Sequence, residues 1–131
     1  MSKKTIWITG GSTGIGKALA IKFASKGWNV AISARRAELL NELSNSYENI
    51  SSFPLDVTDK EKCKEVFNEI KNKYENIDIC FFSTGTWDPK KEKDIDVEQM
   101  EDVFKVNFFG TVNSIKAVEQ YFRDKKNGII T

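Results

Sequence analysis

The chain has 131 residues, of which 40% are hydrophobic and 30% are charged, which is the composition of one globular domain with a real core. Its 20 basic and 19 acidic residues leave a net charge of +1, which gives no electrostatic case for a nucleic-acid or anionic-membrane partner. Histidine is absent, which removes Ser-His-Asp hydrolysis and most transition-metal sites. We therefore expect a single domain, residues 1–131, with no metal and no membrane span. Its two cysteines fit a reducing cytoplasm.

A glycine-rich stretch, Thr9 to Gly16, stands between two regular segments. The apolar residues 4–9 before it predict a strand. Residues 14–26 after it have apolar side chains at helical spacing, and Gly27 lies where that helix is expected to end. A strand, a glycine-rich turn and a helix in this order form a phosphate-binding elbow. Glycine accepts a positive φ and lets a pyrophosphate approach, and the start of the helix offers unpaired N–H groups.

The next segments continue the alternation of strands and helices. Residues 28–34 are apolar throughout, as in a parallel strand buried on both faces, and a short helix follows around residues 39–43. A third strand, residues 50–55, contains Pro54, which predicts a position at the edge of the sheet. Residues 58–61 have the pattern of a capping box at the start of a third helix. The apolar stripe of that helix consists of Cys63, Val66, Phe67, Ile70 and Tyr74.

The last third of the chain holds two more strands and a long helix. Residues 77–82 predict a fourth strand, which leads into the loop Ser83–Thr86. A second capping-box pattern at residues 96–99 opens a helix that is expected to run to about residue 122, and a fifth strand begins at Ile129.

This order predicts an α/β, Rossmann-type three-layer sandwich with a parallel sheet of strand order 3-2-1-4-5 and helices on both faces. The glycine elbow and the loop after the fourth strand are expected to meet where the strand order reverses. The sequence ends within the fifth strand. We therefore expect an N-terminal part of a longer enzyme, or a truncated product, that binds cofactor weakly, self-associates and has no turnover of its own.

The spacing Gly10-x-x-x-Gly14-x-Gly16 after Thr9 resembles the Thr-Gly-x-x-x-Gly-x-Gly signature of the short-chain dehydrogenase/reductase family. A glycine-rich turn without this ancestry is the alternative, but the strand–turn–helix context favours cofactor binding. The resemblance runs along the whole chain. It implies an NAD(P)-dependent oxidoreductase that transfers hydride between nicotinamide and a carbonyl or alcohol substrate. It also implies that the adenosine ribose and phosphates are bound by Gly10, Ser12, Thr13, Gly14, Ile15 and Gly16.

Two further segments match family landmarks. Asp56-Val57 corresponds to the Asp-Val pair beside the adenine, although an aspartate placed there only to precede a helix cap is the alternative. Phe82-Ser83-Thr84-Gly85 replaces the family's Asn-Asn-Ala-Gly stretch, so only Gly85 is kept as such. Ser83 is the positional equivalent of the asparagine that contributes to the cofactor site, but a hydroxyl cannot supply an amide's paired donor and acceptor.

Arg35 follows the second strand, 19 residues after Gly16, near the place where an acidic residue would bind the 2′-hydroxyl of NAD. Arg35 and Arg36 stand there instead, and their guanidinium groups suit a 2′-phosphate. We therefore predict NADP rather than NAD as the cofactor. The alternative is that these arginines only open a solvated helix.

Asn107 resembles the asparagine of the family's Asn-x-x-Gly segment, which belongs to the catalytic tetrad and holds a water in a proton relay. A polar residue on an apolar helix face is the alternative. The family's catalytic serine and Tyr-x-x-x-Lys pair follow the fifth strand and have no counterpart in these 131 residues. Tyr121 and Lys125 have the right spacing, but they lie on the wrong helix, so we interpret them as a coincidence.

A non-catalytic dinucleotide-binding or sensory domain on the same fold remains the alternative function. The altered stretch at Ser83 favours it slightly, whereas Asn107 favours the enzyme. We expect a homo-oligomer, and we expect Cys63 and Cys80 to be small core residues. We interpret Lys90, Lys91 and Lys93 as parts of a solvated loop. Trp87 suits either ligand contact or anchoring of its loop.

Overall fold

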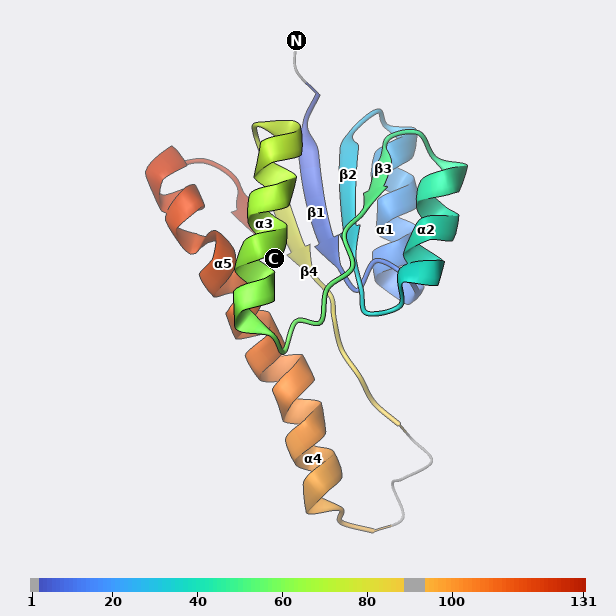
Figure 1. The fold of residues 1–131 in the computed structure, drawn as a ribbon, viewed down its shortest axis with the longest axis vertical. Coiled ribbons are helices and arrows are strands. Elements are labelled where there is room, and N and C mark those ends of the chain that lie inside the picture. The colour runs from blue at the N-terminus through green and yellow to red at the C-terminus, as the bar shows by residue number, and fades with distance from the viewer. Residues whose placement is uncertain (1–2, 89–93) are drawn as a thin grey trace.

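The computed structural model describes residues 3–88 and 94–131 (Figure 1). Five parallel strands form one sheet in the order β3-β2-β1-β4-β5, which confirms the predicted topology. The strands are β1 (Thr5–Thr9), β2 (Asn29–Ser33), β3 (Ile50–Ser52), β4 (Ile79–Phe82) and β5 (Ile129–Ile130). The helices are α1 (Gly14–Ser25), α2 (Ala37–Ser46), α3 (Lys60–Tyr74), α4 (Val97–Phe104) and α5 (Gly110–Lys125), with a π-helical segment η2 (Lys105–Phe109) between the last two.

The helices cover the two faces of the sheet because the strand side chains alternate between them. On β1, Ile6 and Ile8 face α1 and α2, whereas Trp7 faces α3 and α5. Trp7 is the largest fully buried side chain; it stacks on Phe67 of α3, with ring centroids 5.7 Å apart, and meets Phe82 edge-on at 5.6 Å. The two cores are therefore separated by the sheet, as in a doubly wound fold.

The predicted stripe of α3 is confirmed: Cys63, Val66, Phe67 and Ile70 are buried, and Tyr74 packs against the same core. Cys63 and Cys80 are both buried free thiols, as expected of small core residues. None of the described helices is long and apolar enough to cross a bilayer.

Three local predictions were wrong. The third strand ends at Ser52, before Pro54, although β3 does lie at the sheet edge. The cap of α3 is Asp59, whose carboxylate accepts from the Lys62 N–H, because the Thr58 hydroxyl is bound to Asp56 instead. The long helix is interrupted by η2, and its α4 portion extends beyond the sheet layers with no buried residue (Figure 1). The predicted loop lysines at 90, 91 and 93 lie outside the described residues.

Candidate functional site

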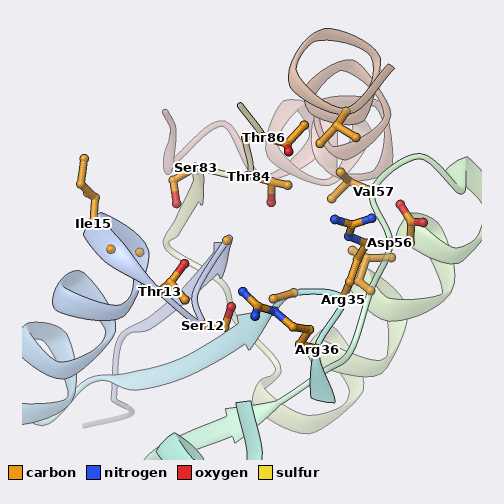
Figure 2. A pocket seen from close by; sticks show the side chains of 17 residues that line it. Ser12, Thr13, Ile15, Arg35, Arg36, Asp56, Val57, Ser83, Thr84 and Thr86 are labelled. Carbon is orange, nitrogen blue, oxygen red and sulfur yellow. The ribbon is translucent and has the colours of Figure 1, made fainter. Parts of the chain in front are cut away.

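A pocket of about 690 Å³ opens at the carboxyl ends of the strands (Figure 2). Its wall brings together the glycine elbow after β1, the arginines after β2, the segment after β3 and the loop after β4. Every residue that the sequence predicts for cofactor binding lies on this wall. The pocket is lined by Gly10, Ser12, Thr13, Gly14, Ile15, Gly16, Ala34, Arg35, Arg36, Leu55, Asp56, Val57, Ser83, Thr84, Gly85, Thr86 and Val106.

Five of these lining residues were not predicted for the cofactor site: Ala34, Leu55, Thr84, Thr86 and Val106. Each is the immediate sequence neighbour of a predicted site residue. For all of them except Val106, which lies in η2, the signal that could have found them is their position, since the carboxyl ends of parallel strands converge on one edge of the sheet.

The glycines of the elbow are required by close contacts as well as by backbone conformation. Gly10 has a φ of +70°, and a Cβ there would lie 2.8 Å from the carbonyl oxygen of Ser83. A Cβ on Gly16 would collide with the carbonyl oxygen of Gly10. Gly14 also has a positive φ, +55°, but a Cβ there would meet nothing within 4 Å. The turn is thus compact on its inner side and open where Gly14 faces outward.

The start of α1 faces this pocket with its backbone donors uncapped. Thr13 is the N-cap residue, but its side chain makes no capping hydrogen bond. The first turn of α1 carries no acidic residue that could compete for the helix start. A helix start of this kind, behind a glycine turn without Cβ atoms, suits a phosphate group.

Arg35 and Arg36 extend from the end of β2 into different parts of the pocket. In Figure 2 the guanidinium group of Arg35 lies beside Asp56 and Val57, whereas that of Arg36 lies toward Ser12. Both side chains are exposed, and within residues 3–88 and 94–131 neither forms an ion pair. Two guanidinium groups are therefore available to an anion on this wall.

Asp56 is ionised and held in place by its own turn. Its Oδ1 accepts from the backbone N–H of Thr58 at 3.0 Å and from the Thr58 hydroxyl at 2.8 Å. Partial burial raises the pKa of Asp56, but the Thr58 hydrogen bonds and the charges of Arg35 and Lys105 outweigh it and lower the pKa below its ordinary value. The carboxylate is thus a fixed acceptor at the rim of the pocket.

The segment that follows Asp56 is tied to α5. The Val57 carbonyl accepts from the side-chain amide of Asn113 at 2.9 Å, and Gly110 has no Cβ where one would lie 2.5 Å from the Val57 side chain. The wall formed by Asp56 and Val57 is therefore positioned by a helix as well as by β3.

Ser83 is used to join the two sides of the pocket. Its hydroxyl donates to the Thr9 carbonyl at 2.8 Å, and its backbone N–H donates to the same oxygen at 3.2 Å. The Ser83 Oγ also lies 2.9 Å from where a Cβ on Gly16 would be. Ser83 thus holds the loop after β4 against the elbow, and the hydroxyl proton is already committed to that contact.

Asn107 lies in η2 and does not line the pocket. Its side-chain amide donates to the Thr86 carbonyl at 3.0 Å and accepts from the Thr86 N–H at 2.7 Å. A Cβ on Gly85 would lie 3.6 Å from its Oδ1. Asn107 therefore fixes the backbone of the loop that forms one wall of the pocket, which is a positioning role.

Tyr121 and Lys125 lie at the opposite, amino end of β4. The Tyr121 hydroxyl accepts from the Ile77 N–H at 2.9 Å, and the Lys125 ammonium donates to the Ile77 carbonyl at 2.6 Å. Both side chains thus bind the backbone where β4 begins, away from the pocket. Elsewhere in the described residues, no cluster of three potential metal ligands occurs. Trp87 is 62% exposed on the loop beyond Thr86.

The model of the short chain dehydrogenase family matches residues 4–131. The chain belongs to this family. Among curated relatives, an uncharacterized oxidoreductase of Listeria monocytogenes is 33% identical over 99% of this chain and 54% of its own length. A 2,3-dihydro-2,3-dihydroxybenzoate dehydrogenase of Bacillus subtilis is 30% identical over 97% of this chain and 50% of its own length. The chain thus spans about half the length of the relatives it matches.

Solved structures agree with this assignment. The NADP-bound protein ElxO is 31% identical, with a TM-score of 0.86 over 98% of this chain and 54% of that chain. A short-chain dehydrogenase from Streptomyces avermitilis is 27% identical, with a TM-score of 0.90 over 99% of this chain and 48% of that chain. The chain therefore has the Rossmann-type fold and belongs to the short-chain dehydrogenase family.

Proposed function

We propose that the chain binds NADP(H) in the pocket at the carboxyl ends of its strands and forms the cofactor-binding part of an oxidoreductase. The observation that carries the NADP preference is the pair Arg35 and Arg36, two cations on the wall after β2 that form no ion pair with any described residue. An acidic side chain at this position would favour the free 2′-hydroxyl of NAD, whereas guanidinium groups favour a 2′-phosphate. NADP bound to ElxO supports the same cofactor class.

The residues of the pocket fit the parts of this cofactor. The turn is open at Gly14, where a pyrophosphate can approach, and the uncapped start of α1 offers it N–H donors. The ionised carboxylate of Asp56 is an acceptor for an adenine amino group, and Val57 provides an apolar wall for the base. When bound, NADP(H) accepts or donates a hydride at its nicotinamide ring, which interconverts an alcohol and a carbonyl compound. This chain's own part is to bind and orient.

Titration of the chain with NADP and with NAD, followed by tryptophan fluorescence, tests the proposal. Trp87 lies next to Thr86 of the pocket wall, so occupancy is expected to change its emission. We expect NADP to bind about tenfold or more tightly than NAD, because a single charge-assisted hydrogen bond supplies enough free energy for a tenfold ratio of the two affinities. Tighter binding of NAD, or no binding of either dinucleotide, would contradict the proposal.

A non-catalytic dinucleotide-binding domain remains the second candidate. It is favoured by Phe82, whose ring packs on Trp7 in the core, and by Ser83, whose hydroxyl bonds Thr9. Neither side chain offers the amide of the family's asparagine pair. NADPH consumption with aldehydes and ketones, measured on the protein expressed from its complete gene, separates the two functions. Turnover supports the enzyme, and tight binding without turnover supports the non-catalytic domain.

We further propose that the chain self-associates through the face formed by α4, η2 and α5. Eight large hydrophobic side chains stand exposed on or beside these elements, and α4 reaches beyond the sheet layers (Figure 1). With a net charge of only +1, two copies do not repel each other strongly, so a second copy of the chain suits this face. The residues are Ile95, Val97, Met100, Phe104, Phe108, Phe109, Val112 and Ile115.

A further inference from the structure

We propose that the Thr84 hydroxyl is an additional ligand of the cofactor, bound to the sugar–phosphate of its adenosine half. This inference rests on the proposed binding of NADP(H) in the pocket. Thr84 stands on the pocket wall between Ser83 and Thr86 (Figure 2). Its Oγ1 is buried from water and has no hydrogen-bond partner among the residues that the structure describes. A buried hydroxyl without a partner is unfavourable, so it calls for a specific reason.

The position of this hydroxyl supplies that reason. In the part of the chain that the structure describes, three buried side-chain oxygens lack a partner, those of Thr9, Ser52 and Thr84. Of these three residues, only Thr84 lines the pocket. The other two are in strands of the sheet and do not reach the pocket wall. Thr84 is therefore the one of these three residues that borders a site where a ligand can bind, although its Oγ1 itself is buried in this conformation.

The backbone around Thr84 places this side chain close to the elbow. A Cβ on Gly10 would lie 2.9 Å from the backbone nitrogen of Thr84, so the loop after β4 crosses directly over the glycine turn. Thr84 thus lies between the elbow, which suits the pyrophosphate, and the Asp56–Val57 segment, which suits the base (Figure 2). The adenosine ribose and its phosphate are the parts of a dinucleotide that join those two ends.

The side chain can meet a ligand without rearrangement of the loop. The loop backbone is held from both sides, by the Ser83 hydroxyl on Thr9 and by the Asn107 amide on Thr86. Because Oγ1 is buried in this conformation, contact with a ligand requires rotation about the Cα–Cβ bond of Thr84 to another staggered position, which leaves the loop backbone in place. A hydroxyl both donates and accepts, which suits a ribose hydroxyl or a phosphate oxygen equally.

The sequence departs from the family pattern at this position. The family's Asn-Asn-Ala-Gly stretch has alanine where this chain has Thr84. The contact that we assign to Thr84 is therefore one that the pattern itself does not provide. It lies next to Ser83, where the asparagine of the pattern is missing and its replacement is bound to Thr9.

The test compares Thr84→Val, Thr84→Ser and the unaltered chain. Valine keeps the shape and removes the hydroxyl, whereas serine keeps the hydroxyl. The probes are NADP and 2′,5′-ADP, which carries the adenosine half alone. We expect T84V to bind both probes about 5- to 20-fold more weakly, as the loss of one hydrogen bond implies, and T84S to bind within about threefold of the unaltered chain.

Thermal unfolding of the same variants without ligand supplies a second readout. Because T84V removes an unpartnered buried hydroxyl, we expect its unfolding temperature without ligand to be equal or higher, so stability does not fall together with affinity. If the hydroxyl had only a structural role, its removal would lower both the unfolding temperature and the affinity.

The outcomes separate the possible failures. Unchanged affinity of T84V for both probes would overturn the inference while leaving NADP(H) binding intact. Weaker binding of NADP with unchanged binding of 2′,5′-ADP would overturn the assignment to the adenosine half. If the unaltered chain binds neither probe, the proposed function is wrong and the inference falls with it.

Discussion

The side-chain amide of Asn107 pairs with both backbone polar groups of Thr86, donating to its carbonyl at 3.0 Å and accepting from its N–H at 2.7 Å. This arrangement connects η2 to the loop that forms one wall of the pocket. The π-helical segment occurs where Asn107 makes this contact, and such segments are frequent at functional sites. Asn107, which does not line the pocket, thus fixes the position of Thr86, which does.

Substitution of Asn107 by leucine removes both hydrogen bonds and is expected to lower the free energy of unfolding by about 1 to 2 kcal/mol, since water can reach the freed groups. It is also expected to weaken NADP binding several-fold, because the loop loses its fixed position. Asn107→Asp keeps the acceptor and loses the donor, so its effects should be intermediate in urea unfolding and in ligand titration. Equal affinities of all three proteins for NADP would show that this contact does not position the pocket wall.

The two glycines Gly14 and Gly16 give a matched pair for testing the elbow. Gly16→Ala forces a Cβ into the Gly10 carbonyl, which is backbone and cannot move aside, so we expect a loss of about 3 kcal/mol or more. In Gly14→Ala the new Cβ contacts no other atom, so only the positive φ lowers the stability, by about 1 to 2 kcal/mol. Thermal unfolding of both variants shows which substitution lowers the stability more. A G14A variant as unstable as G16A would contradict this geometry of the turn.

The sequence was sufficient for the strand order and for the gathering of the elbow, Arg35, Asp56 and Ser83 around one pocket, because parallel strands with right-handed crossovers place their carboxyl ends together. The partners of individual side chains could not be predicted in the same way. Thr58 has the sequence pattern of a cap, yet its hydroxyl donates to Asp56, and the carboxylate of Asp59 caps the helix.

The long helix of residues 97–125 also differs from what its sequence predicts. The sequence predicts one continuous helix, but residues 105–109 are π-helical and most of the large apolar side chains on either side of them are exposed. A helical repeat in the sequence identifies an apolar face and does not reveal what covers it.

The lowered pKa of Asp56 predicts a pH dependence of stability. The unfolded carboxyl titrates near its ordinary pKa of 3.8 and the folded one below it, so the ionised form stabilises the fold above that pH. The stabilisation is lost as the pH falls through the lowered pKa. The difference in unfolding free energy between the unaltered chain and Asp56→Asn should therefore shrink as the pH is lowered from about 6 to 3. A difference that stays constant over this range would contradict the shift.

Self-association should depend on the exposed face of α4, η2 and α5. Phe104→Ser with Phe108→Ser removes two side chains that are 63% and 54% exposed, and we expect the association constant to fall about tenfold or more. Ile15→Ser is the control, because Ile15 is 72% exposed but lies in the pocket wall. Sedimentation equilibrium measures the association constants of the unaltered chain and of the two variants. A monomeric unaltered chain, or equal effects of both changes, would refute the proposed interface.

The most direct test of the NADP site is the affinity of the Arg35→Ala, Arg36→Ala double variant for NADP and for NAD. Because both guanidinium groups face the pocket without an ion partner among the described residues, their removal should cost affinity for the cofactor that carries the 2′-phosphate. We predict that the NADP affinity falls about tenfold or more while the NAD affinity changes less than about twofold. An unchanged ratio of the two affinities would contradict the account.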